Sequence, residues 1–264
     1  MQVFGNDGTR VDVRVDGSGG TAIVLIAGFP LARDIWDVQV ETLARTHRTI
    51  RPDLRGMGKS SVPDGPYLME VLAADVAAAL DALGVERAAI AGHSLGGYVA
   101  LAFARMFAER VSHLALVCSR LAADSPERAA ARRELADRVE RDATVRALVD
   151  AYAPALTAPQ SVRERPDVVA RVREMAGRVG PNAAASMLRG MALRVGADDI
   201  AGDLNVPVTV IAGACDAIIP MEEASAIARA FPRGRLIVCE TSGHVPMLEE
   251  PAKVTAALAA LISE

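Results

Sequence analysis

One serine in the sequence lies in a setting that suits a nucleophile. Ser94 is the serine of a G-x-S-x-G pattern, between a short apolar run at 88–91 and a segment with apolar residues at helical spacing at 95–107. Glycines on both sides let the chain reverse, and this holds the serine in a strained conformation with its hydroxyl free. The amide of Leu95 begins the helix without a helical partner, so it is predicted to stabilise an oxyanion.

A serine hydroxyl is a weak nucleophile at neutral pH, so this chemistry requires a base and an acid that orients the base. Three of the four histidines are poor candidates. His47 lies among charged residues, His113 begins a strand at its amino end, and His93 points away from the nucleophile because strand side chains alternate. His244 remains, on a loop after the last expected strand, and is predicted to be the base.

The predicted acid is Asp216. It follows the strand expected at 206–212 and completes the chain order Ser, Asp, His. Glu240 is the alternative, because it is close to His244 in sequence.

The bare G-x-S-x-G pattern also fits a glycine-rich turn that joins two elements or binds a phosphate. The presence of an acid and a base in the expected order favours the nucleophile.

A second oxyanion donor is predicted at the amide of Phe29. This residue follows the apolar strand expected at 22–27, at the strand end where ligands bind in open α/β sheets, although a plain turn has the same pattern. The loop at 56–60 resembles a phosphate-binding loop, but the first glycine of that motif would fall at Asp53, which excludes a nucleotide site. Asp53 and Arg55 are interpreted as structural residues that tie this loop near the serine.

The elements that must position these residues alternate between strands and helices up to residue 118, which predicts a parallel, doubly wound sheet with right-handed crossovers. The strand at 10–16 alternates polar and apolar residues and is expected in an antiparallel edge hairpin. No strand is expected from 120 to about 198, which predicts a helical insertion. Its charge run at 126–142 is interpreted as a solvated helix face. Its apolar residues form either core or the roof of a pocket: Tyr152, Leu156, Met187, Leu188 and Met191.

Composition restricts the class of protein. The chain has 264 residues, 51% of them hydrophobic, so it can bury a large core. A net charge of −4 with interspersed signs predicts neither a nucleic-acid nor a membrane partner. The sequence has no signal-peptide pattern and is expected to be cytoplasmic. The three cysteines are expected to be reduced core residues, with Cys215 possible at the site, and neither a metal nor a cofactor is expected.

These motifs together resemble the α/β-hydrolase superfamily over nearly the whole chain. The likeness is carried by Gly92 to Gly97, by the loop Asp53 to Ser60, by Asp216 with Pro220, and by Gly243-His244. It implies a mostly parallel, eight-stranded twisted sheet with helices on both faces. It also implies a helical cap at 120–199, inserted between core segments at 1–119 and 200–264.

The resemblance also implies a mechanism. Ser94 attacks an acyl carbonyl, His244 passes the proton to the leaving group, and Asp216 orients His244, while the amides of Phe29 and Leu95 hold the oxyanion. One position departs from the pattern. Many members have a histidine where this chain has Ala27, so a different group must orient the oxyanion loop.

The chain is similar to esterases, enol-lactonases and cofactor-independent haloperoxidases. A serine nucleophile argues against haloalkane dehalogenases and epoxide hydrolases, which use aspartate. The expected function is hydrolysis of a small ester or lactone through an acyl-Ser94 intermediate. Perhydrolase or haloperoxidase-type activity in the same site, or ligand binding without turnover, are the alternatives. The natural substrate and the oligomeric state are left open.

Overall fold

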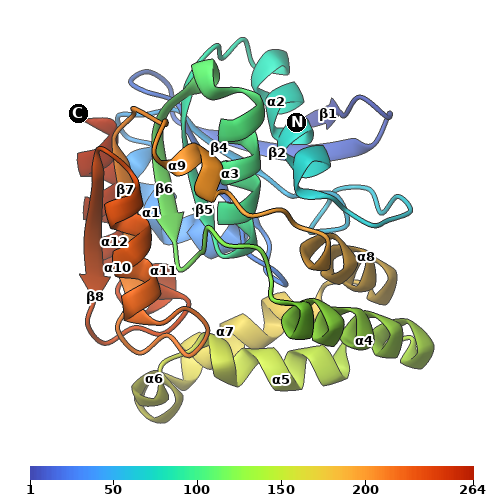
Figure 1. Ribbon diagram of the computed structural model, residues 1–264. Helices are drawn as coiled ribbons and strands as arrows, with labels where there is room; N and C mark the ends of the chain where they lie inside the picture. Colours follow the sequence, from blue (N-terminus) through green and yellow to red (C-terminus); the bar gives the residue numbers. More distant parts are fainter.

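The computed structural model describes residues 1–264 and contains one eight-stranded sheet (Figure 1). The strands lie in the order β1-β2-β4-β3-β5-β6-β7-β8. β2 pairs antiparallel with β1 and β4, and every later pair is parallel. The predicted mostly parallel sheet is therefore confirmed. The strands are β1 (Gln2–Phe4), β2 (Arg10–Asp16), β3 (Ile23–Ile26), β4 (Thr49–Pro52), β5 (Ala88–His93), β6 (Val111–Val117), β7 (Val208–Gly213) and β8 (Gly234–Cys239).

The predicted antiparallel edge hairpin is present, although its other strand precedes β2 instead of following it. β2 has the predicted bounds and pairs antiparallel with the edge strand β1. The turn at 17–20 does not close a hairpin, because the next strand, β3, lies on the far side of β4. The edge strand β1 has three residues, which is too short to show a period of two in the sequence.

Each face of the sheet is covered by helices. Side chains of β3 alternate between two apolar clusters, with Val24 and Ile26 in one and Ile23 and Leu25 in the other. Burying each such side chain contributes about 1.5–3 kcal/mol. The first cluster includes α2 (Met69–Ala82), α3 (Leu95–Met106) and α10 (Met221–Ala230), and the second includes α1 (Asp37–Leu43) and α12 (Pro251–Ile262). The serine at the end of β5 is thus fixed by packing on both faces.

The chain between β6 and β7 contains only helices and the loops that join them, and we call α4 to α9 the helical insertion. In Figure 1 the arrow of β6 points toward α4 to α7, so this part of the insertion faces the carboxyl end of the parallel strands, whereas α9 lies beside α3. Its members are α4 (Pro126–Asp142), α5 (Arg146–Leu156), α6 (Pro159–Glu164), α7 (Pro166–Gly177), α8 (Pro181–Ala192) and α9 (Asp198–Ala201). No helix is long and apolar enough to cross a membrane.

Short helical segments complete the fold. A 3-10 helix, η1 (Arg33–Trp36), precedes α1, and a second, η2 (Ala108–Arg110), precedes β6. α11 (Pro246–Glu249) follows the loop that carries His244. That loop is therefore bounded by a strand on one side and a helix on the other.

Candidate active site

Ser94 occupies a sharp turn between β5 and α3. Its backbone has φ 50° and ψ −113°, a conformation that a side chain rarely adopts without support from its surroundings. Two hydrogen bonds hold it, since the Ser94 amide donates to the carbonyl of Val117 at 2.9 Å and the Ser119 hydroxyl donates to the Ser94 carbonyl at 2.8 Å. The glycines of the motif are required by close approach, because a Cβ on Gly92 would overlap the backbone of Gly96.

His244 and Asp216 form a buried hydrogen-bonded pair. Nδ1 of His244 lies 2.7 Å from Oδ2 of Asp216, and each side chain is 1% exposed. The other carboxylate oxygen accepts the amides of Ile218 at 2.7 Å and Ile219 at 3.1 Å. Burial raises the pKa of Asp216, but the His244 ring and these amides outweigh burial, and the pKa lies below its usual range. The pair therefore places Nε2 of His244 as the free ring nitrogen.

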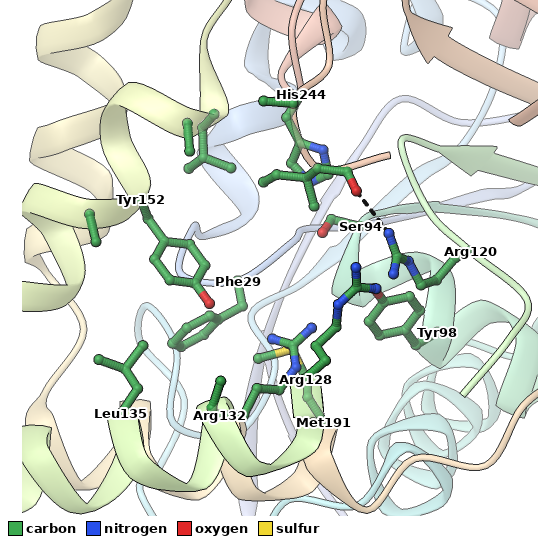
Figure 2. A pocket seen from close by; sticks show the side chains of 16 residues that line it. Phe29, Ser94, Tyr98, Arg120, Arg128, Arg132, Leu135, Tyr152, Met191 and His244 are labelled. Atoms are coloured by element: carbon green, nitrogen blue, oxygen red, sulfur yellow. Dashed lines mark hydrogen bonds between the residues drawn. The ribbon is translucent and has the colours of Figure 1, made fainter. Parts of the chain in front are cut away.

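The nucleophile candidate and the base candidate line one cavity of about 370 Å³. In Figure 2, Ser94 and His244 lie together at one end of this cavity, with the arginines and aromatic residues around the remaining space. The alternative acid, Glu240, is exposed and makes no side-chain hydrogen bond. The structure thus brings Ser94, His244 and Asp216 to the same rim of the sheet and leaves Glu240 outside.

The cavity has two walls of different origin. The core wall comes chiefly from Phe29, Ser94, Tyr98, Arg120, Ile218 and His244. The insertion wall comes chiefly from Arg128, Arg132, Leu135, Tyr152, Ala155 and Met191. Of the apolar residues left open by the sequence, Tyr152, Leu156 and Met191 line the cavity, whereas Met187 and Leu188 are fully buried in the core.

The charge run in the insertion is more than a solvated face, which corrects the sequence interpretation. Arg128 and Arg132 belong to this run on α4, yet both line the cavity. They are four residues apart, so they share one face of the helix. Arg132 is half-buried, whereas Arg128 and the other charged residues of α4 are exposed, so the run is solvated except along the face that lines the cavity.

The two oxyanion candidates lie near Ser94. Phe29 lines the cavity, and its amide makes no hydrogen bond within the protein. Leu95 is the first residue of α3, so its amide has no helical partner. Both amides are available to a ligand in the way that the sequence predicted, and their role as donors remains a proposal.

Asp53 and His93 hold the loop that follows Ala27 and carries Phe29. Asp53 accepts the amide of Arg33 at 3.2 Å and the amide of Lys59 at 3.0 Å, which ties the loops after β3 and β4 together. Gly28 packs directly on the imidazole of His93, where a Cβ would lie 2.5 Å from Nδ1. The loop that carries Phe29 is thus held by the buried carboxylate of Asp53 and the buried ring of His93.

His93 also supports the loop of His244. Its Nε2 lies 2.7 Å from the carbonyl oxygen of His244, so this nitrogen carries the hydrogen and donates it. Burial, together with the nearby His244, lowers the pKa of His93 from 6.5 to about 3. His93 points away from the nucleophile as predicted, but its ring contacts both the oxyanion loop and the His244 loop.

Glu249, a carboxylate that no sequence pattern indicates, joins the two walls. Glu249 accepts the amide of Gly243 and the amide of Ala158, each at 2.7 Å. The first amide lies next to His244, and the second belongs to the helical insertion. The amide of His244 adds a second link, since it donates to the carbonyl of Leu156 at 3.0 Å. Burial raises the pKa of Glu249 above its usual range.

The cysteines do not form a convincing metal site. Cys118 offers a sulfur within 4.8 Å of ligand atoms of Asp216 and His244. Those two residues already bind each other, however, and burial raises the pKa of the Cys118 thiol well above its usual value, which disfavours the thiolate that a metal requires. Cys118 and Cys239 are buried as expected, whereas Cys215 is exposed, contrary to the prediction, and does not line the cavity.

Comparisons with known proteins agree with the fold. The chain is 30% identical to a putative carbamate hydrolase RutD of Azorhizobium caulinodans over 227 residues, which are 85% of this chain and 84% of that protein. A solved thermophilic esterase of Thermogutta terrifontis, with malate bound, superposes with a TM-score of 0.95 at 35% identity and covers 98% of this chain and 96% of that one. An enol-lactonase of Burkholderia xenovorans gives a TM-score of 0.92 at 27% identity, with both chains covered completely.

A family model described as the alpha/beta hydrolase fold matches residues 21–251. The match spans Ser94, Asp216, His244 and the helical insertion. It ends at the first residue of the last helix, so it leaves out β1, β2 and most of α12. The chain therefore belongs to the alpha/beta hydrolase family.

Proposed function

We propose that the protein hydrolyses a small carboxylic ester or lactone through an acyl intermediate on Ser94. The observation that carries this proposal is the 2.7 Å contact between Asp216 and His244, where His244 lines the same cavity as the strained Ser94. A buried carboxylate fixes the tautomer of the imidazole, so Nε2 is free to accept a proton from a serine hydroxyl.

The proposed reaction has two halves. In the first, Oγ of Ser94 attacks the carbonyl carbon while His244 takes its proton, and the resulting oxyanion accepts hydrogen bonds from the amides of Phe29 and Leu95. His244 then gives the proton to the leaving alkoxide, and the alcohol departs. In the second half, water attacks the acyl group in the same way, and the acid is released. A lactone follows the same course, with both products in one molecule.

The relatives support the class of substrate. One of the similar solved structures is an esterase and another is an enol-lactonase. The bonds in an ester and in a lactone are both carboxylic ester bonds. The cavity of about 370 Å³ is near the lower end of the range for small-molecule sites, which favours a short substrate.

The first test is turnover of p-nitrophenyl acetate and butyrate by the unaltered protein and by Ser94→Ala. We expect the substitution to lower kcat by at least about a thousandfold, because the nucleophile is lost. A thermal unfolding curve for each protein checks that the fold is kept. Equal turnover by the two proteins would contradict the proposal.

The second test separates an enzyme from a binding protein on the same scaffold. A fluorophosphonate forms a covalent bond only with an activated serine, so the folded protein should be labelled at Ser94 and the urea-unfolded protein should not. Mass spectrometry of the labelled peptide locates the adduct. A folded protein that resists labelling would favour ligand binding without turnover.

A further inference from the structure

The active-site cavity contains more positive charge than its neighbours neutralise. Arg128 and Arg132 reach it from α4, and Arg120 reaches it from the segment after β6. In Figure 2 these three guanidinium groups surround the space below Ser94. The cavity is otherwise lined mainly by apolar side chains, so these charges are the principal polar groups near a bound substrate.

Two of the arginine side chains at this site share a single carboxylate. Nε of Arg132 lies 2.5 Å from Asp124, and Nη2 of Arg194 lies 3.4 Å from the other oxygen of Asp124. Arg194 also stacks on the ring of Tyr98, with its central carbon 3.9 Å from the ring centre. Asp124 and Arg194 are both almost fully buried, with side-chain exposures of 2% and 3%. One net positive charge is therefore left in this cluster.

Arg128 adds a second positive charge without an ion-pair partner. It is an exposed residue that lines the cavity, and its side chain makes no ion pair and no hydrogen bond with the protein. Arg120, by contrast, is held in place, since it donates to the carbonyl of Ile218 at 2.8 Å and lies 3.3 Å from Glu223. Arg120 is thus neutralised, and Arg128 is not.

Two phenol groups also line the cavity. The hydroxyl group of Tyr98 makes no hydrogen bond within the protein, and that of Tyr152 lies within hydrogen-bonding reach of Arg132. Charges and donors in a largely apolar cavity interact more strongly with an anion than they would in water.

We propose that the substrate is an ester or lactone that carries a second, free carboxylate, which Arg128 and Arg132 bind while the scissile carbonyl lies at Ser94. The planar guanidinium fork matches a carboxylate, and the apolar lining suits the short aliphatic segment between the two groups. This inference rests on the proposed function. For a monoester, hydrolysis consumes one water and releases an alcohol and a dicarboxylate.

A carboxylate fits better than a phosphate monoester. The apolar residues around the arginines leave few further donors for a group with three charged oxygens, and the amide of Arg128 in the first turn of α4 is already taken by the hydroxyl of Ser125. Inorganic phosphate nevertheless has the same charge attraction to Arg128, so it is included as a competitor in the binding measurement.

The hydrolysis experiment compares monomethyl adipate with dimethyl adipate. We expect the unaltered protein to prefer the monoester by at least about tenfold in kcat/KM, which corresponds to about 1.4 kcal/mol. Arg128→Gln should reduce that preference by a similar factor. The matched control is Arg133→Gln, because Arg133 is exposed on the same helix, lies outside the cavity, and carries the same charge; it should retain the preference.

The binding experiment does not depend on turnover. Calorimetry with the Ser94→Ala protein measures the affinity for monomethyl adipate, for dimethyl adipate and for inorganic phosphate. We expect the monoester to bind at least about tenfold more tightly than the diester, and Arg128→Gln to remove the difference. A result in which phosphate competes as strongly as the monoester would overturn the assignment to a carboxylate.

The two experiments distinguish failure of this inference from failure of the proposed function. Hydrolysis of both esters with equal kcat/KM, unchanged by Arg128→Gln, would overturn the carboxylate site and leave the hydrolase intact. Absence of hydrolysis and of Ser94 labelling, together with binding of the monoester that requires Arg128, would overturn the reaction and support the anion site.

Discussion

The core wall and the insertion wall of the cavity treat their charged groups in opposite ways. On the core wall, Asp216 is 1% exposed, and its oxygens are taken by the His244 ring and two backbone amides. On the insertion wall, Arg132 shares Asp124 with Arg194, and Arg128 has no charged partner. The charged groups of the core wall have their partners within the protein, whereas the arginines of the insertion wall gain a partner when an anion binds.

This difference indicates how the two tasks of an enzyme are divided. Chemistry requires a base whose tautomer and position are fixed before the substrate arrives, and fully satisfied buried groups provide that rigidity. Selection requires groups whose hydrogen bonds are made only with the correct ligand. Changes on the core wall should therefore alter the rate for every ester, whereas changes on the insertion wall should alter the choice among esters.

The strongest test of this division is Asp216→Asn. The amide keeps the size of the side chain but removes the charge and favours the wrong tautomer of His244, so we expect kcat to fall by about 10³–10⁴. The loss should be similar for charged and neutral esters. Steady-state kinetics with p-nitrophenyl acetate and monomethyl adipate measures it.

Glu240→Gln is the matched control for Asp216→Asn. Glu240 is the other carboxylate near His244 in sequence, and it is exposed. We expect its substitution to change kcat by less than about twofold, because an exposed carboxylate without a hydrogen-bond partner contributes little to the energy of the site. A large loss in Glu240→Gln with a small loss in Asp216→Asn would reverse the assignment of the acid.

The second test concerns the buried ring beneath the core wall. The folded protein keeps His93 neutral because burial lowers its pKa from 6.5 to about 3. The unfolded chain protonates this residue near 6.5, so it binds more protons than the folded protein between these pH values. The free energy of unfolding therefore falls by about 1.4 kcal/mol per pH unit as the pH drops from 6.5 toward 3.

His93→Gln should weaken this dependence. Glutamine can still donate a hydrogen bond to the carbonyl of His244, but it does not titrate. Between pH 7.5 and 4.5, the substituted protein should lose about 2–3 kcal/mol less than the unaltered protein. Urea unfolding at the two pH values gives the difference. If both proteins lose the same free energy, His93 is not held neutral by burial.

The third test breaks the link between the walls. Glu249 accepts one amide from each side, and in Glu249→Gln the side-chain NH₂ must face one of these two donors. An unpaired buried donor costs about 1–3 kcal/mol, so the free energy of unfolding should fall by that amount. We also expect kcat to fall by about tenfold, since Gly243 adjoins His244. Unchanged kcat with lowered stability would show that the link is structural only.

The sequence predicts the core wall well because its geometry follows from local rules. The glycines on either side of Ser94 mark the sharp turn between strand and helix. The chain order of Asp216 and His244 follows from the order of the strands. β2 and α3 have almost the bounds that alternation and helical spacing predict. Such patterns repeat every two or every 3.6 residues, so they can be read without knowledge of distant contacts.

The residues that were missed all act across long sequence distances. Glu249 begins no recognisable motif, yet it reaches an amide 91 residues away in the insertion. The role of His93 depends on a carbonyl 151 residues away. Arg128 and Arg132 lie in a run whose composition is typical of a solvated helix, and only the packing of α4 against α8 turns one face toward the cavity. The boundaries of the cap at 120–199 stay a prediction.

The smallest expected effect comes from filling space on the insertion wall. Ala155→Leu adds three carbon atoms at the cavity. It should lower kcat/KM for p-nitrophenyl butyrate by about tenfold and kcat/KM for the acetate by less than about threefold. The reason is that a difference of one methylene in an apolar pocket changes discrimination between substrates by about 10–200-fold. Ala130→Leu, at an exposed position of α4, is the control and should leave the ratio unchanged. Equal losses for both esters in Ala155→Leu would mean that the insertion wall also controls the chemistry.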